Sequence, residues 1–146
     1  MSRGLGDVYK RQITGKCAKD TLIPDLISIC KVNGQHQFII FDAKYYNAHL
    51  ETGIAPTGQP GIESVTKQYL YQLAYQKFIE DHNFSSVKNC FLLPTENNEI
   101  EDKGEVRMEM LSNLGLQDIK GRLIPATMAY DLYLSGRKMD IADLEL

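Results

Sequence analysis

The stretch that decides the fold is Leu22–Tyr46, which reads LIPDLISICKVNGQHQFIIFDAKYY. Two β-rich segments, Leu26–Val32 and Gln37–Tyr45, flank the dipeptide Asn33-Gly34. This dipeptide favours a two-residue type I′ turn because both positions tolerate positive φ, so the stretch predicts a β-hairpin. The second segment contains FIIF, which is apolar on both faces, as expected for a strand that is covered on both sides.

The predicted turn also sets the pairing of the two strands. If Asn33 and Gly34 are the two central turn residues, the same register places Asp25 opposite Asp42. Opposed side chains have Cβ atoms about 5 Å apart, and two carboxylates at that separation need a cation or a shared proton. Lys44 lies two residues beyond Asp42, so it projects from the same face. The register therefore predicts two carboxylates and one ammonium at one end of the hairpin.

Such a cluster has a chemical interpretation and a simpler structural one. Oxygen ligands suit Mg²⁺ or Mn²⁺ rather than zinc, and a nearby ammonium can stabilise charge that develops on a phosphate. Hydrolysis of a phosphodiester uses these parts. The alternative is that Asp25 caps a turn after Pro24, and that Asp42 and Lys44 form an ordinary surface ion pair.

The rest of the chain alternates between helical and strand patterns. A loop rich in Gly and Pro covers residues 47–61, and an acidic loop covers residues 95–105. The remaining predicted elements are a helix over Ile62–His82, strands over Val87–Leu93 and Val106–Met110, and a helix over Leu123–Ser135 with Pro125 in its first turn. This order predicts an α/β fold whose mixed sheet of about four strands is flanked by helices.

Length and composition favour one globular domain. The chain has 146 residues and is 43% apolar and 24% charged, which excludes fibrous and disordered classes. No apolar run is long enough for a membrane span or a secretory signal. The irregular spacing of Cys17, Cys30 and Cys90 argues against a disulfide framework or a zinc site, and fits a reducing cytoplasm.

Residues 1–12, MSRGLGDVYKRQ, show no structural period. They resemble the translated sequencing adapter found at the ends of assembled reading frames, so we exclude them from the fold argument. The alternative is a natural disordered terminus. We expect the native domain to cover residues 13–146 and to be truncated at its N-terminus.

The spacing of Pro24-Asp25, sixteen residues and then Asp42-Ala43-Lys44 resembles the signature of PD-(D/E)XK nucleases. Within that superfamily, the wording FDAKYYN, VTKQYLYQLAY and CFLLP is similar to the LlaJI-type restriction endonucleases and their McrC-like nuclease relatives. The resemblance runs from about Leu22 to the end of the chain and implies the restriction-endonuclease-like fold.

The resemblance also implies a role for each matching residue. Asp25 and Asp42 would be metal ligands, with the carbonyl of Ala43 as a third, and Lys44 would position water or stabilise the transition state. Gln68, on the following helix, would contact Lys44, water or a DNA phosphate. The sequence departs from the family before the hairpin, where many members supply an additional Glu and this chain has none.

The implied function is cleavage of double-stranded DNA in a prokaryotic restriction system, with Mg²⁺ as the cofactor and Mn²⁺ as a substitute. The implied partners are an AAA-type GTPase or ATPase subunit, or an N-terminal recognition domain that this chain lacks, and a homodimer would let both strands be cut. We expect a cytoplasmic protein without membrane contact. The net charge of −3 argues against strong DNA binding by the chain alone. Two alternatives remain: a repair or recombination nuclease of the same fold, and an inactive interaction domain.

Overall fold

The computed structural model describes residues 23–45 and 60–146, and the N-terminal segment 1–12 lies outside these ranges. The described strands form one mixed sheet in the order β1-β2-β3-β5-β4. Their bounds are β1 Leu26–Val32, β2 Gln35–Ala43, β3 Ser86–Thr95, β4 Glu101–Val106 and β5 Ile119–Pro125. The β1–β2 and β4–β5 pairs are antiparallel, whereas β2, β3 and β5 run parallel. The predicted α/β fold is confirmed, with five strands where about four were expected.

The first hairpin has the predicted register. Leu26 pairs with Phe41 and Val32 pairs with Gln35, which is the alignment that the turn requires. Asn33 and Gly34 both have positive φ, 50° and 83°, as a type I′ turn demands. The turn dipeptide therefore determines which residues meet at the opposite end of the hairpin.

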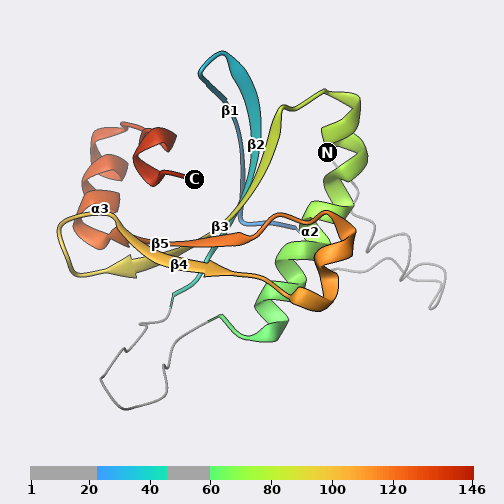
Figure 1. The fold of residues 1–146 in the computed structure, drawn as a ribbon. Coiled ribbons are helices and arrows are strands. Elements are labelled where there is room, and N and C mark those ends of the chain that lie inside the picture. Colours follow the sequence, from blue (N-terminus) through green and yellow to red (C-terminus); the bar gives the residue numbers. More distant parts are fainter. Residues whose placement is uncertain (1–22, 46–59) are drawn as a thin grey trace, which may run out of the picture.

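Helix α2, Ile62–Asp81, crosses from β2 to the parallel strand β3 and covers one face of the sheet (Figure 1). The other face carries helix α3, Ala126–Ser135, and the short 3₁₀ helix η2, Ile141–Leu144. Because side chains alternate along a strand, the apolar run of β2 supplies both layers. Its Phe38 and Ile40 pack with Tyr71 of α2, whereas Ile39 and Phe41 pack with Cys90 and Leu144.

The second half of the chain departs from the sequence prediction at two places. Strand β4, Glu101–Val106, forms where an acidic loop was expected. The predicted strand Val106–Met110 is wrong, because only Val106 belongs to a strand and the 3₁₀ helix η1 covers Glu109–Leu114. The final helix begins at Ala126 because Leu123 to Pro125 pair with β3 as the end of β5. Strand pairing between distant segments overrides local preference at both places.

Among the described residues, no helix is both long and apolar enough to cross a membrane.

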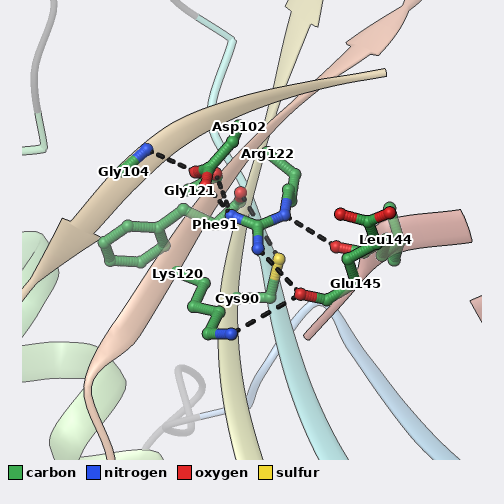
Figure 2. Close-up of polar contacts among 9 residues, drawn as sticks. All are labelled: Cys90, Phe91, Asp102, Gly104, Lys120, Gly121, Arg122, Leu144 and Glu145. Carbon is green, nitrogen blue, oxygen red and sulfur yellow. Dashed lines mark hydrogen bonds and ion pairs between the residues drawn. The ribbon is translucent and has the colours of Figure 1, made fainter. Parts of the chain in front are cut away.

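A buried arginine attaches the C-terminal segment to the sheet (Figure 2). Arg122 of β5 is 5% exposed, and its guanidinium donates to the carbonyl oxygens of Leu144 at 2.7 Å and Glu145 at 2.9 Å. It also pairs with the Asp102 carboxylate of β4 at 2.8 Å. One guanidinium thus donates to two backbone carbonyl oxygens of the C-terminal segment and also pairs with the edge strand β4.

We expect Arg122→Met to lower the free energy of unfolding by about 3 kcal/mol, because the buried carbonyl oxygen of Leu144 and the partly buried acceptors on Glu145 and Asp102 lose their donor. Urea unfolding followed by circular dichroism measures this loss. The matched control is Arg137→Met, since Arg137 is exposed and bonds only Ser135 through its side chain; its effect should stay within about 0.5 kcal/mol. Equal midpoints for the two variants would contradict the anchoring role.

Candidate active site at the end of the first hairpin

The hairpin brings together the two aspartates that the register predicted. Asp25 directly precedes β1 and Asp42 is the penultimate residue of β2. The backbone N–H of Ala43 donates to Asp25 Oδ2 at 2.8 Å, so the exposed carboxylate of Asp25 is held against the β2 strand end. The Asp25 carboxyl group lies near enough to Asp42 to raise the pKa of its carboxyl group. Asp25, Asp42 and the backbone of Ala43 therefore occupy one small region.

Lys44 completes this group. Its backbone N–H donates to Leu92 O at 2.8 Å, which extends the β2–β3 pairing by one residue and fixes the direction of the side chain. The ammonium forms an ion pair with Asp42 Oδ2 and lies 5.4 Å from the centroid of the Phe91 ring. The Lys44 side chain is 14% exposed, so a desolvated cation stands beside the two carboxylates.

The electrostatics of Asp42 differ from those of a surface aspartate. The residue is 4% exposed, and burial raises the pKa of its carboxyl group. Lys44 lowers this pKa through its hydrogen bond and charge, whereas Asp25 raises it further. Apart from the Lys44 ion pair, Asp42 Oδ2 has no polar partner among the described residues. A buried carboxylate oxygen of this kind is typical of a site that binds a ligand.

Helix α2 adds two further residues at this end of the sheet. The Lys67 ammonium lies 5.8 Å from the centroid of the Tyr71 ring, and its hydrogen bond to Tyr71 raises the pKa of Lys67. Burial raises the pKa of Tyr71, and the charges of Asp42 and Asp25 act on both residues. Lys67 is exposed, so the sequence alone could not distinguish it from a solvated lysine.

Gln68 lies elsewhere than the resemblance implied. Its side chain is completely buried, and Nε2 donates to Ile40 O at 3.0 Å and to Asn89 Oδ1 at 3.1 Å. Asn89 in turn donates to Gln72 Oε1 at 2.7 Å. The structure thus shows Gln68 bonded to β2 and β3 rather than to Lys44, and leaves it no exposed surface for a DNA phosphate.

Asn89 is the residue that sequence reasoning missed in this network. It is 1% exposed and directly precedes the apolar run CFLL of β3. An amide beside such a run needs buried partners, and this signal could have identified it. Among residues 23–45 and 60–146, no group of three or more His, Cys, Asp or Glu side chains is placed to hold a metal.

Comparison with known proteins identifies the family of the chain. The family model described as "LlaJI restriction endonuclease" matches residues 9–133, so the chain belongs to the LlaJI restriction endonuclease family. The chain is also 34% identical, over 128 residues, to the "Type II restriction enzyme BsuMI component YdjA" of Bacillus subtilis (strain 168). That match covers 86% of this chain and 26% of the relative, so the chain spans about a quarter of the relative's length. No solved structure matches the chain.

The buried network predicts a structural effect of Gln68. We expect Gln68→Leu to lower the free energy of unfolding by about 2 kcal/mol, because Asn89 Oδ1 loses a buried donor. Urea unfolding measures the change, with Gln76→Leu as the control. Gln76 lies on the same helix, is exposed and bonds Glu80 through its side chain. A loss in Gln68→Leu no larger than in the control would contradict the supporting role.

The buried carboxylate predicts a pH-dependent effect. Since burial raises the pKa of Asp42, the folded state holds this proton more tightly than the unfolded chain does. The free energy of unfolding therefore falls as the pH rises through the raised pKa of Asp42. In metal-free buffer at neutral pH, we expect Asp42→Asn to raise the melting temperature, because the neutral amide avoids the cost of burying an ionised carboxylate.

The same gain should vanish in acid, where the parent carboxyl is protonated. Thermal unfolding at a series of pH values tests this dependence. Asp81→Asn, at an exposed aspartate that pairs with Lys77, is the control. A destabilised Asp42→Asn protein at neutral pH would show that Asp42 is a structural anchor instead.

Proposed function

We propose that this chain carries the catalytic site of a metal-dependent DNA endonuclease that works in a restriction system, of the PD-(D/E)XK type. The observation that carries the proposal is the hairpin register, which places Asp25 beside Asp42 and aims Lys44 at the same carboxylate. Membership of the LlaJI restriction endonuclease family supports cleavage of DNA as the reaction.

The proposed cofactor is Mg²⁺, with Mn²⁺ as a substitute. Asp25, Asp42 and the carbonyl oxygen of Ala43 would hold it, because hard divalent cations prefer oxygen ligands. The residues fit the ion: the two carboxylates adjoin, and Asp42 Oδ2 is buried with Lys44 as its polar partner among the described residues. When bound, such an ion stabilises negative charge on a phosphate and makes a bound water more acidic.

The chain's own residues have distinct proposed tasks in hydrolysis. The N–H of Ala43 orients Asp25, as its 2.8 Å hydrogen bond indicates. Lys44 donates to the attacking water or to a phosphate oxygen, and it is desolvated enough for its charge to act strongly. Gln68 donates from α2 to Ile40 O of β2, two residues before Asp42, so we propose that it positions the site without touching DNA.

DNA recognition is proposed to need more than this chain. The net charge of −3 provides little general attraction for phosphates. The Bacillus subtilis relative is a component of a restriction enzyme and is much longer than this chain. We therefore propose that other subunits or domains supply most of the DNA contacts, with an AAA-type GTPase or ATPase and a second copy of the chain as the partners to test, in the cytoplasm of a prokaryote.

The direct test is nicking of supercoiled plasmid by the purified chain with Mg²⁺ or Mn²⁺. We expect Asp42→Ala and Lys44→Ala each to lower the nicking rate by about 100-fold or more. The matched controls are Asp81→Ala and Lys77→Ala, because these residues form an Asp–Lys ion pair on the exposed end of α2. Nicking that survives unchanged in either site variant would overturn the proposal.

Measuring the melting temperature with and without Mn²⁺ distinguishes an inactive domain from an active one that lacks a partner. Mn²⁺ that binds only the folded state raises the melting temperature, and this rise should disappear in Asp42→Ala. A parent chain that neither nicks DNA nor responds to Mn²⁺ would favour the inactive interaction domain.

A further inference from the structure

A cleft of about 160 Å³ opens on the face of the sheet that carries Asp42. Its floor is apolar and consists of Phe91, Leu93 and Ile119, each at most 2% exposed. Pro60, next to the N-cap residue Gly61 of α2, and Lys103 of β4 form parts of its walls. Phe91 adjoins both the cleft and the candidate active site, because the Lys44 ammonium lies over its ring.

Lys103 reaches this cleft because of an irregularity in β4. Asp102 pairs with Arg122 and Gly104 pairs with Gly121, so Lys103 is the extra residue of a β-bulge. A Cβ at position 121 would lie 3.1 Å from Lys103 Cβ, so the glycine leaves the space that the lysine stem occupies. Bulges commonly redirect a side chain near a functional site.

The bulge is held from the opposite face. Asp102 Oδ1 accepts from the Gly104 N–H at 2.6 Å and from Arg122 Nη1 at 2.8 Å (Figure 2). In the same view, the Phe91 ring points to the other side of the sheet from Cys90 and the C-terminal carbonyl groups. The arginine that anchors the chain end therefore also stabilises the backbone turn that presents Lys103.

Three described lysines have a polar partner in the structure. Lys44 pairs with Asp42, Lys77 with Asp81, and Lys120 lies 3.5 Å from Glu145 O. Lys103 is half-buried, yet it makes no ion pair or hydrogen bond with another described residue. Glu105 also borders the cleft and is the register partner of Lys120.

The sheet register gives the separation between Lys103 and the active site. Asp42 pairs with Phe91, and Phe91 pairs with Gly121, over which the Lys103 stem lies. Two strand spacings amount to about 10 Å. A DNA strand rises about 3.4 Å per nucleotide, so a phosphate at Lys103 would lie within about three nucleotides of one at Asp42.

We propose that this cleft is a subsite for the DNA strand being cut, in which Lys103 binds a backbone phosphate that flanks the scissile one. The inference rests on the proposed nuclease function and extends it. A half-buried cation that has no ion-pair partner among the described residues suits a phosphate of the DNA backbone.

The test is binding of a fluorescent DNA duplex by the full chain in EDTA, measured by anisotropy over a range of salt concentrations. Lys103→Gln should raise Kd about 5- to 10-fold near 0.1 M salt and reduce the salt slope by about one. Lys103→Arg should keep both values near those of the parent. Lys31→Gln is the control, because Lys31 is an exposed lysine next to the hairpin turn, far from Asp42.

The outcomes are distinct. A Lys103→Gln protein that binds DNA like Lys31→Gln, while the parent binds normally, overturns the subsite and leaves the proposed nuclease intact. A parent chain that shows no DNA binding at any salt concentration overturns the subsite together with direct DNA contact by this chain. Equal melting temperatures of the parent and Lys103→Gln confirm that a loss of binding does not come from unfolding.

Discussion

The two-residue turn at Asn33-Gly34 is the constraint on which the candidate site depends. Both residues have positive φ, and this geometry allows one register for β1 and β2. A slip of one residue would turn every side chain of one strand to the other face and separate Asp25 from Asp42. The turn therefore fixes the alignment of two carboxylates that each lie eight residues from the nearest turn residue.

Two polar networks hold the sheet from its opposite faces. Gln68, Asn89 and Gln72 join α2 to β2 and β3 on the Asp42 side. Arg122 and Asp102 join β5, β4 and the C-terminal segment on the other side. Buried networks of this kind are costly unless each member has partners, so they favour one arrangement of the strands. On the Asp42 face of this sheet, Asp42, Phe91 and the Lys103 stem over Gly121 lie side by side across neighbouring strands.

Sequence reasoning identified the hairpin, its register and helix α2, because a turn dipeptide and a long helical pattern are local signals. It missed β4, whose sequence EDKGEV is polar and becomes a strand only by pairing with β5. It also assigned Gln68 to the site surface, since the direction of its amide depends on Asn89 from a distant strand. The position of Lys103 in the cleft could not be predicted either, because a β-bulge depends on how two strands pair.

If the register of the first hairpin creates a divalent metal site, Mn²⁺ should bind between Asp25 and Asp42. The decisive measurement is anomalous diffraction near the manganese absorption edge from crystals of the chain soaked in Mn²⁺. We expect an anomalous peak between the two carboxylates, within coordination distance of the Ala43 carbonyl oxygen and absent from Asp42→Ala crystals. A peak that lies away from both aspartates, or a site that stays empty at saturating Mn²⁺, would contradict it.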